Sequence, residues 1–205
     1  MEKIKSRLEK IGIGLPDIFL PSGDVDLTKW SVVACDQYTS QPEYWADVEK
    51  LVNDSPSTLR LILPEVYLED ENSSYRILDI RKAMDSYINE GVLSLQKPGL
   101  IYVERKTSHS PLRKGLILSV DLEKYDYAKG STALIRATEG TVIERIPPRV
   151  KIREKAALEL PHIMLLIDDP ERSVVEPLAE RKEQLQKLYD FELMMDGGHI
   201  RGYKI

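Results

Sequence analysis

Residues 133–153 read ALIRATEGTVIERIPPRVKIR, and our prediction of the fold starts from this stretch. Its apolar beginning predicts a strand over 132–137, and the polar residues 138–141 predict a turn. The proline pair that follows favours a helix from about residue 148 to residue 158, because proline is compatible with the first turn of a helix. A strand, a turn and a helix therefore succeed one another in the middle of the chain.

Hydrophobic periodicity on both sides of this stretch predicts further elements of both kinds. Apolar residues at helical spacing predict helices over 2–11, after Ser40, from Ser74 and after Ser173. Short apolar runs predict strands over 31–34, 59–63, 99–104, 115–120, 162–167, 191–195 and 200–205. The most apolar of these runs, 162–167, is expected at the centre of the sheet. The predicted fold class is α/β, of the mixed α+β kind, with a central mixed sheet and helices packed on it.

Local signals predict where two of these helices start and where the last two strands turn. Ser40 with Glu43, and Ser173 with Glu176, fit the capping box, in which the serine side chain accepts a hydrogen bond from an amide of the first turn. The Asp196-Gly197 pair is typical of a tight hairpin turn.

The composition is that of a globular domain. The 205 residues are 42% apolar and 31% charged, which suffices for a sizeable core under a well-solvated surface. We therefore treat residues 1–205 as a single domain. No window approaches the roughly eighteen continuous apolar residues of a membrane helix, so no membrane span is predicted.

The net charge and the cysteine content limit the classes of binding partner and the cellular compartment that we expect. The net charge of -5 argues against general nucleic-acid binding, which needs a surplus of lysine and arginine over one face. Cys35 is the only cysteine, so no internal disulfide can form, which suits the reducing cytoplasm. One cysteine and three scattered histidines do not make a zinc signature, so no metal site is predicted.

Arginines in the opening stretch suggest a centre that binds an anion. Arg149 and Arg153 would lie one helical turn apart on the same face. Arg145 would precede the amino end of that helix, where free N–H groups favour an anion. Arginine forks match the geometry of phosphate and carboxylate groups. The predicted ligand-binding residues are Arg136, Thr138, Thr141, Arg145, Arg149 and Arg153.

Two carboxylates are candidates for catalysis beside that centre. Glu139 lies in the predicted polar turn, where it could act as an acid or base or hold a cation. Asp36 follows the predicted strand 31–34 and could face the arginines across a cleft. In the competing interpretation, the arginines pair with acidic neighbours on a solvated face, and those neighbours are Glu144, Glu154 and Glu159.

Several motifs together resemble a known family. They are Asp36-Gln37-Tyr38, the central motif from Ile135 to Arg149 with its continuation Glu159-Leu160-Pro161-His162, and the segment from Phe191 to Tyr203. Over essentially the whole chain the sequence is similar to the bacterial and archaeal domain-of-unknown-function family numbered one thousand and fifteen. Many members carry His-Glu where this chain carries Thr138-Glu139, which leaves Glu139 as the shared acid.

The resemblance implies no established activity, but it does imply a longer chain and a relationship to other domains. Members look roughly twice this long, so the chain is expected to be the amino-terminal part of a longer one. Their second half holds an Asp-Gly-(Asn/His)-His element similar to that of ParB-like and free-serine-kinase-like domains. That likeness implies nucleotide and phosphoryl chemistry, with a nucleotide and Mg as the cofactor.

Two main hypotheses on function follow. In the first, the chain is part of a cytoplasmic enzyme that binds a phosphorylated or nucleotide ligand through its arginine-rich centre. In the second, it is a non-catalytic ligand-sensing or assembly domain, with Arg149 and Arg153 each against a carboxylate and no open pocket beside Glu139. The expected partners are a small anionic ligand and, in a homodimer, a second copy. A third option, ParB-like DNA binding, is opposed by the acidic balance.

Overall fold

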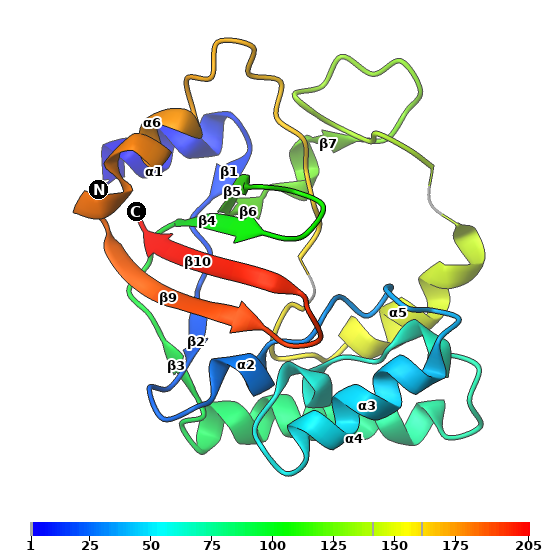
Figure 1. Ribbon diagram of the computed structural model, residues 1–205. Helices are drawn as coiled ribbons and strands as arrows, with labels where there is room; N and C mark the ends of the chain where they lie inside the picture. Colours follow the sequence, from blue (N-terminus) through cyan, green and yellow to red (C-terminus); the bar gives the residue numbers. More distant parts are fainter. Residues whose placement is uncertain (1, 141, 161) are drawn as a thin grey trace.

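The computed structural model describes residues 2–140, 142–160 and 162–205, which form the predicted mixed α+β fold (Figure 1). Its helices are α1 (Glu2–Lys10), α2 (Leu27–Trp30), α3 (Pro42–Val52), α4 (Ser73–Asn89), α5 (Ile146–Arg153) and α6 (Glu176–Arg181). The strands are β1 (Ile13–Gly14), β2 (Phe19–Pro21), β3 (Leu93–Leu95), β4 (Ile101–Lys106), β5 (Arg113–Ile117), β6 (Ser119–Val120), β7 (Tyr125–Asp126), β8 (Ile135–Arg136), β9 (Gln186–Leu193) and β10 (Gly198–Lys204). Short 3-10 turns are η1 (Thr58–Leu61), η2 (Glu65–Tyr67), η3 (Leu122–Lys124), η4 (Ile143–Arg145) and η5 (Lys182–Gln184).

A four-stranded antiparallel sheet is the main β structure, in the order β5-β4-β10-β9. Three two-stranded pairs surround it, β1 with β6, β2 with β3, and the parallel pair β7 with β8. The sheet therefore joins a hairpin from the middle of the chain to the hairpin at its end.

The β9–β10 hairpin confirms the predicted turn at Asp196-Gly197. Gly198 leaves this turn with φ +89, a conformation that side chains rarely adopt. A Cβ atom at this position would lie 2.0 Å from the backbone oxygen of Lys106 on β4. Glycine is therefore required here both by the turn and by the close approach of β4.

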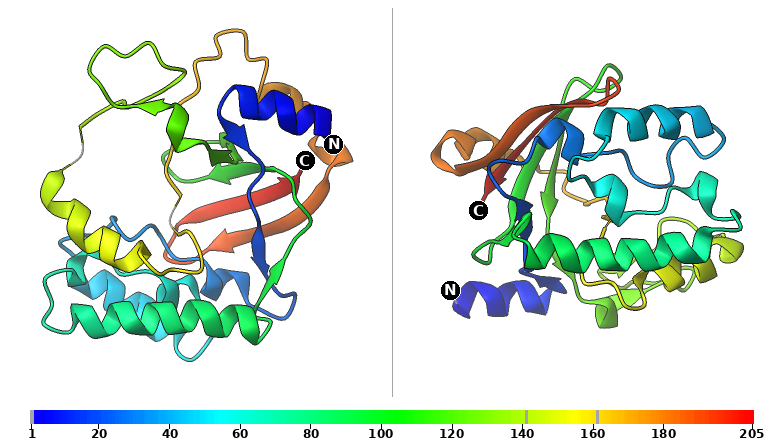
Figure 2. Two further views of the ribbon diagram at one scale, coloured as in Figure 1. Left: turned by 180° about the vertical axis from the view of Figure 1, so that it is seen from behind. Right: turned by 90° about the horizontal axis from the view of Figure 1, so that it is seen from below.

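Two apolar clusters form the core beneath the sheet. The first lies on α4 and comprises Trp30, Leu61, Leu63, Ile77, Ile80, Met84 and Leu93. The second lies on α3 and comprises Trp45, Val48, Val52, Leu59, Ile62 and Met194. Helices α3, α4 and α5 gather at this end of the molecule in Figure 1, and both views of Figure 2 agree.

Some predicted elements took a different form. Residues 31–34 form no strand, and 59–63 overlap the 3-10 turn η1. Both predictions are wrong because an apolar run reports burial and not backbone shape, and Leu59 and Leu61 are buried from a 3-10 turn. The helix predicted over 148–158 is α5, which begins two residues earlier and ends at Arg153.

The predicted capping boxes are also absent. Helix α3 has Gln41 at its N-cap, with Pro42 in its first turn and no side-chain cap. Helix α6 has Val175 at its N-cap, again without a side-chain cap. Ser173 lies upstream of α6 and bonds to Asp169 instead. The sequence pattern is present at both positions, but each helix begins after the serine, with its N-cap at Gln41 or Val175.

The largest correction concerns residues 162–167, which were predicted as the central strand. They run in extended form without secondary structure between α5 and α6 (Figure 1). Side chains 163–167 are 49% to 78% exposed. None of the strand pairs among the described residues includes them, so no ladder holds this apolar run in the sheet.

Candidate functional site

Arg149 lies where α5 meets the loop that carries Asp36. Its Nη2 atom is 3.4 Å from Oε2 of Glu65, whose side chain is 9% exposed. The Glu65 amide in turn donates a hydrogen bond of 2.7 Å to the carbonyl of Cys35. The turn η2 therefore links the loop that carries Cys35 to helix α5 through Glu65.

The pKa of the Cys35 thiol reflects both the burial and the charges at this junction. Burial is the largest influence and raises the pKa of Cys35, and the neighbouring Arg149 charge opposes it. Because burial prevails, the thiol stays protonated at neutral pH and is a poor nucleophile. Asp36 itself is exposed beside it. The junction thus offers a cation and an exposed carboxylate rather than an activated cysteine.

Arg153 also has an acidic partner. Its Nη1 atom forms an ion pair with Oε1 of Glu159, just beyond the end of α5. Both side chains are more than a third exposed, so the pair contributes little to stability. Arg149 and Arg153 are thus each matched by a carboxylate, the first from distant η2 and the second from nearby in sequence.

The remaining predicted residues precede α5. Arg136 is exposed on β8, where its neighbour in register on β7 is Asp126. Thr138 and Glu139 are exposed in the loop that follows β8. Thr141 lies outside the described residues, and for Arg145 only the backbone position in η4 is described. Among the described residues, no hydrogen bond or ion pair joins Glu139 to Arg149.

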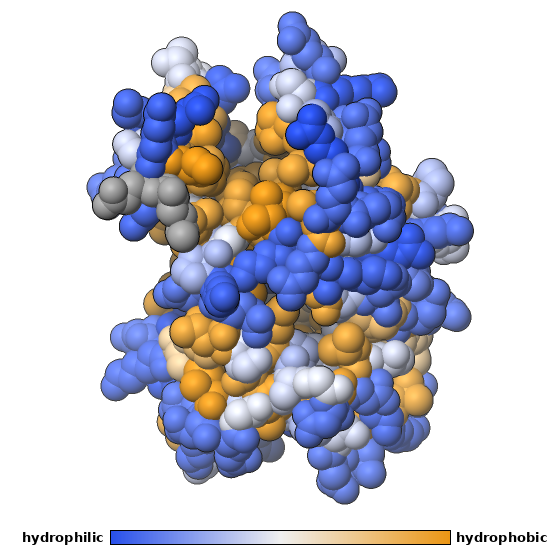
Figure 3. Space-filling view, turned by 90° about the vertical axis from the view of Figure 1, so that its left-hand side faces the viewer, coloured by the Kyte–Doolittle hydropathy of each residue, from blue (hydrophilic) through white to orange (hydrophobic). Residues whose placement is uncertain are grey.

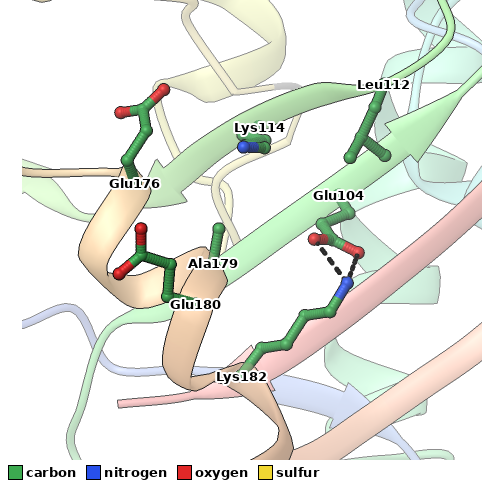
Figure 4. A pocket seen from close by; sticks show the side chains of 7 residues that line it. All are labelled: Glu104, Leu112, Lys114, Glu176, Ala179, Glu180 and Lys182. Carbon is green, nitrogen blue, oxygen red and sulfur yellow. Dashed lines mark hydrogen bonds and ion pairs between the residues drawn. The ribbon is translucent and has the colours of Figure 1, made fainter. Parts of the chain in front are cut away.

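A buried carboxylate on the sheet was missed by the sequence reasoning. Glu104 on β4 is 2% exposed. Both of its carboxylate oxygens accept hydrogen bonds of 2.9 Å from Nζ of Lys182, and Oε1 also accepts one of 2.8 Å from the Tyr102 hydroxyl. Figure 4 shows Lys182 reaching Glu104 across a hollow. The sequence does contain one signal that could have identified Glu104, which is its position as a charged residue at the end of a predicted apolar strand.

That hollow has a volume of about 290 Å³ between the sheet and α6. It is lined by Glu104, Leu112, Lys114, Glu176, Ala179, Glu180 and Lys182. Burial acts to raise the pKa of Glu104, but the hydrogen bonds from Lys182 and Tyr102 prevail and hold it below its usual range. Glu104 is therefore ionised and fully engaged, which suits a structural ion pair better than a general base.

One row of cross-strand neighbours alternates in charge across all four strands of the sheet. The register places Lys114, Glu104, Arg201 and Asp190 opposite one another on β5, β4, β10 and β9. Arg201 Nε donates to Asp190 Oδ1 at 3.1 Å. Opposite charges at neighbouring positions stabilise this register, because a slip of one residue would move each charge to the other face.

His199 adds a second row to this network. Its Nε2 lies 2.5 Å from Oδ1 of Asp190, and its Nδ1 lies 2.6 Å from Oε1 of Glu192. Hydrogen bonds to Glu192 and then to Asp190 raise the pKa of His199. Hydrogen bonds from Lys187 and His199 lower that of Asp190. The hairpin is thus closed by ion pairs along its outer edge.

Metal and membrane sites receive no support from the described residues. No group of three or more His, Cys, Asp or Glu among them could hold a metal ion. None of their helices is both long enough and apolar enough to cross a bilayer.

Comparison with known proteins gives a family but no activity. A family model described as "Protein of unknown function (DUF1015)" matches residues 19–205, so the chain belongs to this family and the expected resemblance is confirmed. No curated protein and no solved structure matches the chain.

Proposed function

We propose that this member of the DUF1015 family is a non-catalytic assembly domain that presents residues 162–167, the apolar segment, to another polypeptide. The observation that carries the proposal is the exposure of five consecutive large apolar side chains, 163–167. Each buried side chain of this size stabilises an interface by roughly 1.5–3 kcal/mol. Contiguous apolar surface of this kind marks interaction sites in folded proteins.

The backbone of the apolar segment supports the same function. Residues 162–169 form no helix and no strand, and the described backbone–backbone hydrogen bonds include none from 162–168. An extended stretch whose backbone makes no hydrogen bond within the described part of the chain is a template for a further strand. The segment can thus offer both side chains and hydrogen bonds to a partner.

A second apolar surface lies on α1. Ile4, Leu8 and Ile11 follow helical spacing and line a hollow of about 520 Å³ together with Arg7 and Lys10. Figure 3, which views the side of the molecule that carries α1 and α6, shows apolar side chains gathered in a hollow between polar rims. An amphipathic helix with an uncovered apolar face is also expected in a domain built for assembly.

The paired arginines favour assembly over catalysis. Arg149 and Arg153 each contact a carboxylate, which is the arrangement expected if these arginines are structural. Neither hollow described above is lined by Glu139 or Asp36. The hypothesis of a structural role for the arginines therefore has the better support.

Photo-crosslinking tests the assembly function. A photoreactive amino acid replaces Leu165, and in a matched control it replaces Leu122, which is 74% exposed on η3. We expect a discrete crosslinked product from position 165 and none from position 122. Absence of any product from position 165, in a variant with an unchanged circular dichroism spectrum, contradicts the assembly function.

A second candidate function is binding of a phosphorylated or nucleotide ligand by Arg149 together with the other predicted residues. One observation favours it: the Arg149 side chain, which contacts Glu65 at 3.4 Å, is 36% exposed, so its guanidinium group is within reach of a ligand from solvent.

Titration calorimetry tests this candidate with inorganic phosphate and with ATP and Mg. We expect heat that is lost in Arg149→Gln and kept in Arg172→Gln, which changes an arginine in the loop before α6. No heat at millimolar phosphate or ATP contradicts anion binding at this junction.

A further inference from the structure

We propose that the partner of the apolar segment is a second copy of the same segment, paired with it antiparallel about Leu165. This inference rests on the assembly function proposed above and adds the identity of the partner. Two copies would form a two-stranded ladder across a twofold axis. In such an isologous interface each contact occurs twice.

The sequence of the segment complements itself in this register. With Leu165 opposite Leu165, Ile163 faces Ile167 and Met164 faces Leu166. At the two ends His162 faces Asp168, so each imidazole can donate a hydrogen bond to the carboxylate of the other copy. Apolar groups meet apolar groups, and both polar ends have a partner.

Neighbouring registers lack this match. If the centre moves to Leu166, Asp168 faces Met164 and Asp169 faces Ile163. If it moves to Met164, Asp168 faces Leu160 and His162 faces Leu166. Each shift places carboxylates against apolar side chains, which costs free energy when the interface excludes water. The match of apolar with apolar side chains and of hydrogen-bond donor with acceptor therefore selects the register about Leu165.

The fold holds the segment in place at both ends. On its amino side Leu160 packs against both core clusters. On its carboxyl side Asp169 accepts hydrogen bonds from the amides of Ser173 and Val174 at 3.0 and 2.9 Å. A strand that is fixed at both ends loses less conformational entropy on pairing than a free one.

Sedimentation equilibrium of the whole chain tests the second copy as partner. The wild-type chain is expected to dimerise, and Leu165→Asp to remain monomeric with an unchanged circular dichroism spectrum. Leu122→Asp, a change of equal chemistry at an exposed site outside the segment, is expected to dimerise like the wild type. A wild-type chain that stays monomeric at all concentrations overturns the inference.

A charge-exchange experiment tests the register and does not depend on Leu165→Asp folding correctly. His162→Asp alone brings two carboxylates together at each end, and Asp168→Lys alone removes the carboxylate that accepts from each imidazole, so each homodimer should be about tenfold weaker. In a mixture of the two variants, one end of the heterodimer pairs the new aspartate with the new lysine and the other end keeps the His162–Asp168 hydrogen bond, so a heterodimer should form with about wild-type affinity. Equal strength of all three dimers overturns the antiparallel register.

The crosslinking experiment separates failure of this inference from failure of the assembly function. A product from position 165 with twice the mass of the chain supports the second copy. A product of any other mass overturns the second copy and leaves the assembly function standing. No product contradicts both.

Discussion

The four-stranded sheet and the apolar segment differ in whether their backbones are paired with a neighbouring strand. In the sheet each strand pairs with its neighbours, and a row of alternating charges crosses all four strands. The apolar segment 162–167 has more apolar character than most of these strands, yet it lies exposed and outside every described strand pair. Hydrophobicity alone therefore did not decide which run entered the sheet.

This contrast implies that changes in the sheet should destabilise the fold, whereas changes in the segment should affect association. The largest effect is expected from Glu104→Ala, which leaves the ammonium group of Lys182 and the Tyr102 hydroxyl without their buried acceptor. We expect a loss of about 4 kcal/mol in the free energy of unfolding, measured by urea denaturation. Glu180→Ala, at an exposed position on the same hollow, should change it by less than about 0.5 kcal/mol. Equal effects of the two changes would contradict a structural ion pair at Glu104.

The next effect concerns the hairpin. Gly198→Ala should cost about 2–3 kcal/mol, because the new Cβ meets the Lys106 carbonyl oxygen at a positive φ. The matched control is Gly23→Ala, where a Cβ meets nothing within 4 Å. Thermal unfolding of both variants compares them directly. A Gly198→Ala chain as stable as the control would show that β4 does not approach the turn this closely.

The pH dependence of stability tests the His199 network. Because hydrogen bonds to Glu192 and Asp190 raise the pKa of His199 above 6.5, its contribution is fully present below that pH. It is lost as pH rises through the raised pKa of the folded state. Urea denaturation between pH 6 and pH 8 should therefore give falling stability in the wild type, and His199→Gln should flatten that fall. An identical slope in the variant would exclude His199 as its cause.

The smallest effect on stability is expected in the apolar segment itself. Leu166→Ser removes a side chain that is 78% exposed and should change the free energy of unfolding of a dilute, monomeric sample by less than about 0.5 kcal/mol. The same change should weaken association, measured by sedimentation equilibrium. A loss of several kcal/mol in the dilute sample would mean that Leu166 already belongs to the core of this chain.

The features that could be predicted from the sequence are those with a local cause. The helix predicted from Ser74 is α4, because its apolar stripe needs only helical spacing and a core. The final hairpin was predicted from a two-residue turn signal. Residues 31–34 and 162–167 were mispredicted as strands, because pairing depends on a partner elsewhere that periodicity does not reveal.

In the candidate site, too, ion pairs between residues close in sequence could be predicted, whereas long-range ion pairs could not. The pair Arg153–Glu159 lies within a few residues, and Glu159 was among the acidic neighbours expected to match the arginines. The pair Arg149–Glu65 spans 84 residues and needed the fold to bring η2 to α5. Glu104 was missed because its partner Lys182 is 78 residues away. Long-range ion pairs follow from topology, which spacing along the sequence does not encode.

The most direct test of the apolar segment as an interface strand is hydrogen exchange of the amides of residues 163–167, measured over a range of protein concentrations. We predict fast exchange in dilute samples and protection that increases with concentration, while the amides of β4 and β10 stay protected throughout. Fast exchange of 163–167 at every concentration, or protection already complete in the monomer, would contradict the proposed interface.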